Sequence, residues 1–295
     1  MMRKLYLLAI ASACVFGCNK IETPDQADGV MRFRVDYPST KAAGTSFEAG
    51  DKIGVYITGY EGGKAQDLQL GGNYKTNNPV IYDGTKWTAD PLIYWDENVE
   101  MYDVYAYYPF TIPTSVDEMP FSVELDQRVP KTQNDLSAYE ASDFLYASAK
   151  KVTSAGGDIN LLFKHKMSKL TVNIVKGEDY EGDIPSAAIV QVHGTVTDCL
   201  IDLSTGDVVK NPRASSNTII AKQVDEDTHT AVIVPQMLSN KQPLIEILFK
   251  DVSYMVESKF NFKSGTHHVI NITMNRNPDK VKIEIGGEIE NDWTM

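Results

Sequence analysis

The chain has 295 residues, of which 42% are hydrophobic and 23% charged, and this ordinary globular composition excludes a collagen-like repeat or a chain disordered throughout. Its 28 Lys and Arg residues stand against 40 Asp and Glu residues, which gives a formal charge of −12 and argues against a nucleic-acid partner. The 15 Tyr residues, together with frequent Val, Ile and Thr, favour β-structure.

The first 17 residues have the pattern of a secretory signal peptide. Arg3 and Lys4 are basic, and an apolar run follows that is shorter than the ~20 residues of a membrane span. Val15-Phe16-Gly17-Cys18 resembles a bacterial lipobox, so we predict that Cys18 carries lipid and that residues 18–29 form a flexible tether. Cys14 is the second candidate, but it would leave a shorter apolar run. An ordinary signal peptide with incidental cysteines is the alternative.

A lipid on Cys18 would leave Cys199 without an intramolecular partner, so no disulfide framework is expected. Cys199 lies in an alternating apolar segment, where a buried structural thiol is the favoured role.

Strand-like alternation begins at residue 30. The apolar residues Met31, Phe33, Val35 and Tyr37 alternate with polar ones, which predicts a half-buried strand that ends at Pro38. Further strands are expected over 53–57, 91–95, 101–110, 143–149 and 159–175. The last of these has a change of parity near Ser168, which suggests a bulge.

The acidic, glycine-containing segment 176–183 is expected to separate two domains, 30–178 and 179–295. Strands are predicted after it over 188–193, 199–203, 218–221, 231–234, 244–249, 253–262, 268–274 and 281–285. The only helix expected is a single turn over 137–141. Together these patterns predict an all-β protein of two antiparallel β-sandwiches in tandem.

Catalytic signatures are not found, and we expect no enzymatic activity, no cofactor and no metal. His267 and His268 are neighbours on a strand and would point to opposite faces. His165 is read as a core histidine with a backbone or hydroxyl partner. Asp225-Glu226-Asp227 lacks the spacing of a calcium loop and is read as a solvated acidic loop.

The tyrosine-rich segment 102–109 has two interpretations. Packing in the core of a sandwich is the favoured one, and stacking on sugar rings is the alternative.

Several segments, in this order, are similar to the fimbrillin superfamily, the pilus subunits and anchor proteins of Bacteroidales. The matching segments are Phe47-Glu48-Ala49-Gly50-Asp51, Pro91-Leu92-Ile93-Tyr94-Trp95, Val104-Tyr105-Ala106-Tyr107-Tyr108-Pro109, Ser142-Asp143-Phe144-Leu145, Leu162-Phe163-Lys164-His165, Val234-Pro235-Gln236 and Asn291-Asp292-Trp293.

The resemblance implies two transthyretin-like β-sandwiches and assembly by strand exchange. Family members are exported as outer-membrane lipoproteins, and a trypsin-like protease then removes the lipid and first strand, which opens a groove for a strand of another subunit. In this chain the removable strand would be Met31 to Tyr37, and the cut would follow Lys41 in the loop 38–43. The family usually has Arg at that position, so a protease restricted to Arg would cut only at Arg34.

The resemblance predicts a structural or adhesive subunit of a cell-surface fimbrium that meets a host or bacterial surface ligand. The sequence stops two residues after Trp293 with no further strand to donate, which favours a tip, accessory or anchor subunit. The alternatives are a permanently anchored surface lipoprotein that binds glycans and a secreted hydrolase.

Overall fold

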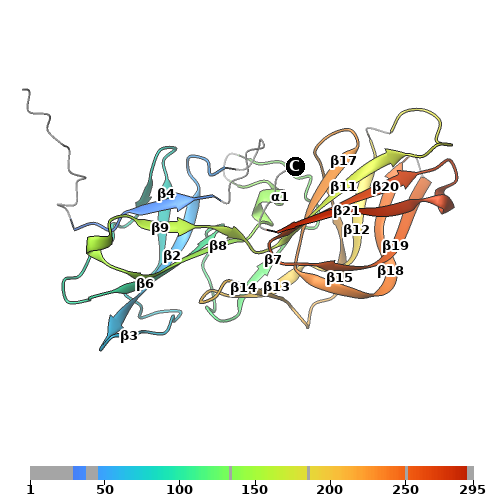
Figure 1. Cartoon of the computed structure of the whole chain (residues 1–295). Coiled ribbons are helices and arrows are strands. Elements are labelled where there is room, and N and C mark those ends of the chain that lie inside the picture. Colours follow the sequence, from blue (N-terminus) through green and yellow to red (C-terminus); the bar gives the residue numbers. More distant parts are fainter. Residues whose placement is uncertain (1–28, 38–45, 133–134, 185–186, 250–251, 291–295) are drawn as a thin grey trace, which may run out of the picture.

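The computed structural model describes residues 29–37, 46–132, 135–184, 187–249 and 252–290. The described part is nearly all-β, as the sequence predicts, and its sheets form two lobes side by side in an elongated molecule (Figure 1). The predicted helical turn is α1 (Ala138–Ala141), which begins with a capping box between Ser137 and Glu140. Within these residues no helix is long and apolar enough to cross a membrane.

The N-terminal lobe is built on one nine-stranded sheet. Its strand order is β10-β8-β6-β2-β4-β5-β1-β9, with β3 paired to β2. The strands are β1 (Phe33–Asp36), β2 (Lys52–Glu61), β3 (Lys64–Ala65), β4 (Lys75–Tyr82), β5 (Trp87–Ala89), β6 (Tyr102–Tyr108), β8 (Leu145–Val152), β9 (Ile159–Leu162) and β10 (Lys164–His165). All neighbours run antiparallel except β1 and β9, which are parallel.

Two sheets form the C-terminal lobe, with strand orders β16-β17-β11-β20-β21 and β15-β12-β18-β19. The strands are β11 (Ser168–Lys176), β12 (Ile189–Val196), β15 (Ser216–Ile220), β16 (Lys222–Gln223), β17 (Thr228–Ile233), β18 (Gln236–Phe249), β19 (Val252–Phe262), β20 (Thr266–Met274) and β21 (Lys282–Glu290). Their alternating apolar residues, such as Val172, Ile245 and Ile270, are almost fully buried in a shared core.

A segment between β6 and β8 ties the two lobes together. Within it β7 (Met119–Ser122) pairs with β13 (Asp198–Asp202), which in turn pairs with β14 (Asp207–Lys210). We call residues 116–132 and 135–139 the strap. The fully buried Gln127 of the strap donates to the carbonyl of Val232 at 2.7 Å and accepts from the backbone N–H of Val232 at 2.8 Å. The strap therefore belongs to the core of the C-terminal lobe, although it comes from the N-terminal half of the sequence.

The predicted long strand over 159–175 is in fact three strands, β9, β10 and β11, that belong to two sheets. Along β9 and β10, the alternating side chains of Leu161, Phe163 and His165 are buried, and the first two belong to the core of the N-terminal lobe. The side chains of Leu170 and Val172 are instead buried in the C-terminal lobe. The parity change near Ser168 marks this passage between sheets. Residues 168–176, which the sequence placed in the N-terminal domain, are hydrogen bonded to β17 and β20 of the C-terminal lobe.

Candidate functional site: the seat of the first strand

The first strand, β1, lies inside the N-terminal sheet. It runs parallel to β9, from the pair Phe33 and Ile159 to the pair Asp36 and Leu162. On its other side Phe33 pairs with Trp87 of β5. Because both flanks of β1 are occupied, removing it would leave a slot between β5 and β9 with unpaired backbone groups on each side.

The alternation predicted for β1 is present in the structure. Met31 and Phe33 are buried, at 2% and 6% exposure, while Val35 and Tyr37 are half-buried on the same face. Arg34 and Asp36 point away from the core and are exposed. The apolar face of β1 thus completes the core of the lobe.

The two ends of β1 are held differently. Toward the N-terminus, Met31 donates its N–H to the carbonyl of Ile93 at 2.8 Å, and Arg32 accepts at 2.8 Å from the N–H of Ile159 on the opposite flank. Beyond Phe33, the flank that faces β5 is paired with none of the described strands, whereas the β9 flank stays bonded up to Asp36. Among the described strands, β1 is therefore paired on both flanks at Phe33 and on the β9 flank alone from Arg34 to Asp36.

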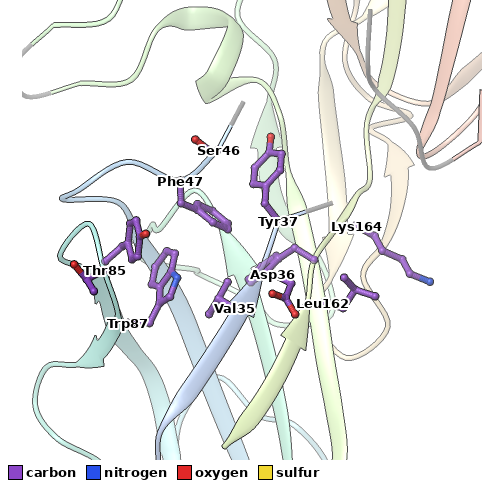
Figure 2. A pocket seen from close by; sticks show the side chains of 11 residues that line it. Val35, Asp36, Tyr37, Ser46, Phe47, Thr85, Trp87, Leu162 and Lys164 are labelled. Atoms are coloured by element: carbon purple, nitrogen blue, oxygen red, sulfur yellow. The ribbon is translucent and has the colours of Figure 1, made fainter. Parts of the chain in front are cut away.

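A cleft of about 710 Å³ lies beside this end of β1 (Figure 2). Val35 and Tyr37 form one side of it, Thr85 and Trp87 line the opposite side, and Phe47 lies between them. The cleft occupies the space that opens where β1 and β5 diverge.

Phe47 is the centre of an aromatic cluster at the cleft. Its ring contacts with the described aromatic residues are all edge-to-face, which is an arrangement that ring quadrupoles favour. The ring centroids of its neighbours lie 4.8 Å away for Trp87, 5.0 Å for Tyr37, 5.4 Å for Tyr108 and 5.9 Å for Phe163. Tyr37 comes before residues 38–45 and Phe47 comes after them, so this cluster holds together the two described segments between which the predicted cut falls.

His165 packs against Tyr37, the residue that follows β1. The imidazole is buried, and its Nδ1 lies 2.9 and 3.0 Å from the two carboxylate oxygens of Asp143. Its ring meets that of Tyr37 edge to face at 5.7 Å. The expectation of a core histidine is confirmed, but its partner is a carboxylate rather than only a hydroxyl or backbone group.

The tyrosine-rich strand β6 is buried along its whole length, as expected for core packing. Even Tyr105, on the face away from the lobe's core, is covered by Lys150, whose Nζ lies 3.6 Å from the ring centroid. These tyrosines therefore offer no open aromatic platform to a sugar ring.

The other histidines and acids singled out by sequence lie apart from the seat of β1. His267 and His268 are both buried, and the Nε2 of His267 lies 2.8 Å from the hydroxyl of Thr171. Asp225–Asp227 is an exposed turn between β16 and β17. Within the described residues, no three His, Cys, Asp or Glu side chains gather in a way that could hold a metal ion.

Two predicted sites, Cys18 and Lys41, lie outside the described residues. Cys199 is buried as predicted, and burial raises the pKa of its thiol to about 12. Phe47 and Trp87 lie at the site of β1, although neither was predicted to belong to it. Phe47 was named only within a segment that is similar to the fimbrillin superfamily, and its four aromatic partners, Tyr37, Trp87, Tyr108 and Phe163, come from four different chain segments.

Comparison with known proteins places these features in context. The sequence profile of the fimbrillin-like family matches residues 40–293. A protein of Bacteroides uniformis described as a candidate fimbrium subunit, Fim1C, is 24% identical over 99% of this chain and 96% of its own length. A candidate fimbrium tip subunit of Bacteroides ovatus is 26% identical over 46% of this chain, which is about a quarter of that protein's length.

A solved structure from Bacteroides uniformis, described as a candidate cell adhesion protein, has the same fold. It superposes with a TM-score of 0.67, covers 90% of this chain and 99% of its own, and is 17% identical in sequence.

Proposed function

Because the chain belongs to the fimbrillin-like family, we propose that it is a structural or adhesive subunit of a surface fimbrium, assembled by exchange of its first strand. The observation that supports this most directly is the position of β1. It is an interior strand, it carries part of the core, and in the sequence it is followed by the segment that contains Lys41.

The contribution of β1 to stability is consistent with a strand that must be replaced once it is removed. Burial of a large apolar side chain is worth roughly 1.5–3 kcal/mol, and Met31 and Phe33 are both almost fully buried. The backbone bonds to β9 and to Ile93 are lost with them. Such a loss is comparable to the total stability of a domain, about 5–15 kcal/mol, so an opened lobe would need a replacement strand.

The proposed route begins with export and lipidation at Cys18, which would anchor the precursor in the outer membrane. A trypsin-like protease would then cut after Lys41 and release the lipid together with β1. Another fimbrial subunit would supply the new strand. We place the protein at the tip of the fimbrium or in an accessory position, where it would meet a host or bacterial surface ligand.

Cleavage and release test the exchange directly. Trypsin treatment of the purified precursor should cut after Lys41, and the fragment that carries β1 should be released when a donor subunit is added. Lys41→Ala should abolish this cut and the association with the donor. If the cleaved protein keeps its full stability after losing β1, or never takes up a donor strand, the proposal is wrong.

Lipidation is tested separately in cells. A fatty-acid analogue should label the wild-type protein and fail to label Cys18→Ala. Equal labelling of the two would exclude lipid at Cys18, and loss of label only in Cys14→Ala would move the lipid to that residue.

A further inference from the structure

The cleft beside Tyr37 has a role that follows from the geometry of β1. We propose that this cleft is the initiation site at which a partner strand begins to displace β1, and that an aromatic side chain of the partner docks there first. The inference rests on the proposed strand exchange and specifies its partner: a β-strand with alternating apolar residues and an aromatic residue near one end.

The backbone determines where displacement can begin. An incoming strand must take over the hydrogen bonds that β9 makes with β1. At the N-terminal end both flanks of β1 are engaged, through Ile93 and Ile159. At the C-terminal end the flank of Val35 that faces β5 borders the cleft, and none of the described strands pairs with it. The first contacts of a partner strand can therefore form here while β1 is still bound.

The wall of the cleft determines which side chain is favoured. Phe47 and Trp87 lie edge to face at 4.8 Å, and Tyr82 stacks on Trp87 at 5.1 Å. All three rings line the cleft. An aromatic side chain meets such a surface in offset or edge-to-face geometry, which an aliphatic side chain cannot reproduce.

The aromatic residues that line the cleft, apart from Tyr37, would remain in the lobe after cleavage. Tyr37 precedes residues 38–45 and would leave with β1, whereas Phe47 follows them and would stay on the body of the lobe. Phe163 and His165, which also contact this aromatic cluster, stay with it. A partner aromatic residue that docks in the cleft can then move into the place of Tyr37 as the strands exchange.

Displacement kinetics test the proposal on the full chain from Asn19, with a recognition sequence for a site-specific protease inserted in the loop 38–45. After cutting, the fragment that carries β1 is labelled at its N-terminus, and an unlabelled peptide with the sequence of residues 29–41 is added as competitor. Fluorescence anisotropy follows the release of the labelled fragment. The release rate should rise with competitor concentration, because the competitor binds before β1 leaves.

Competitor variants locate the first contact. A Tyr37→Leu competitor should displace roughly tenfold more slowly, because it loses the aromatic contacts of the cleft. A Met31→Ala competitor changes the opposite end, so it should lower the final extent of exchange while its displacement rate changes by less than about twofold. Equal rates for the wild-type and Tyr37→Leu competitors would overturn the proposal.

A variant of the body tests the cleft itself. Thr85 lines the cleft and is exposed. The larger side chain in Thr85→Trp should fill the cleft and slow displacement of β1 at least roughly fivefold. The melting temperature of the cut protein should not change. Thr85→Ser is the matched control and should behave as wild type. A release rate independent of competitor concentration, or an unchanged rate in Thr85→Trp, would show that displacement starts elsewhere. If no peptide exchanges at any concentration, strand exchange itself fails, and the initiation site fails with it.

Discussion

The ring of Tyr37 packs edge-on against the ring of Phe47, with centroids 5.0 Å apart and planes inclined by 82°. Tyr37 directly follows β1 and Phe47 comes after residues 38–45, so this contact is one of those that hold the end of β1 against the body of the lobe. In the proposed route, a cut after Lys41 would break the chain next to β1 while this packing still holds β1 in place.

Phe47 should therefore contribute strongly to the stability of the intact lobe. We expect Phe47→Ala to lower the free energy of unfolding by about 2–3 kcal/mol, because it removes a half-buried ring and its edge-to-face contacts. Urea unfolding followed by tyrosine and tryptophan fluorescence measures this. Ile112→Ala, at a side chain that is 81% exposed, is the control and should stay within about 0.5 kcal/mol of wild type. A Phe47→Ala protein as stable as the control would contradict the prediction.

Gln127 should be essential for the attachment of the strap. Gln127→Ala leaves the buried N–H and carbonyl of Val232 without their partner, and we expect a loss of about 2–3 kcal/mol in unfolding free energy. Gln69→Ala, at an exposed glutamine, is the matched control. Similar midpoints in urea for both variants would show that the strap is held by its apolar contacts alone.

The strap and β11 also predict how the protein responds to a cut between the lobes. A protease site inserted within residues 177–183 should yield two fragments that stay together on size-exclusion chromatography. The N-terminal fragment would retain β11, which lies between β17 and β20, and β7, which pairs with β13. The fragments should separate only in denaturant. Two independent pieces in native buffer would mean that the lobes fold separately, as the sequence alone suggests.

Two buried histidines should make the fold sensitive to mild acid. Burial lowers the pKa of His229 and of His268 below the ordinary value of about 6.5. In the window between the lowered pKa and about 6.5, the unfolded chain binds more protons than the folded one, so stability is complete above this window and is lost as pH falls through it. Each unit of lowering is worth about 1.4 kcal/mol.

Urea unfolding at pH 7.5 and 5.5 measures this effect. His229→Gln should be less stable overall, because the carbonyl of Ala188 loses its imidazole partner, but its stability should change less between the two pH values. An identical pH dependence in wild type and variant would show that His229 does not titrate on unfolding.

Cys199 should be unreactive in the folded protein. In a chain that begins at Asn19 it is the one cysteine, and burial raises the pKa of its thiol to about 12, so the thiolate is scarce at pH 8. A disulfide exchange reagent should label it slowly in buffer and within seconds in urea. Rapid labelling in buffer would place the thiol at the surface.

The alternation of side chains along single strands was readable from the sequence because burial has a period of two in a strand. Met31 and Phe33 point into the core as predicted, and so do Leu161, Phe163, Leu170 and Val172. The capped turn at Ser137 and the buried thiol of Cys199 follow from equally local signals. The strand β4 was missed, because its first residues, Lys75-Thr76-Asn77-Asn78-Pro79, are polar or break strands.

Which strands pair with which was decided only by the tertiary structure. Apolar side chains alternate with a period of two residues on either side of Lys166. This alternation could not show that β10 and β11 belong to different sheets. The pairing of β7 with β13 and the bonds of Gln127 to Val232 join residues far apart in the sequence. The aromatic cluster of Phe47 and the cleft beside Tyr37 likewise gather five segments at one point. Local alternation specifies a face of each strand, whereas long-range packing selects its neighbours, and the candidate site is made of those neighbours.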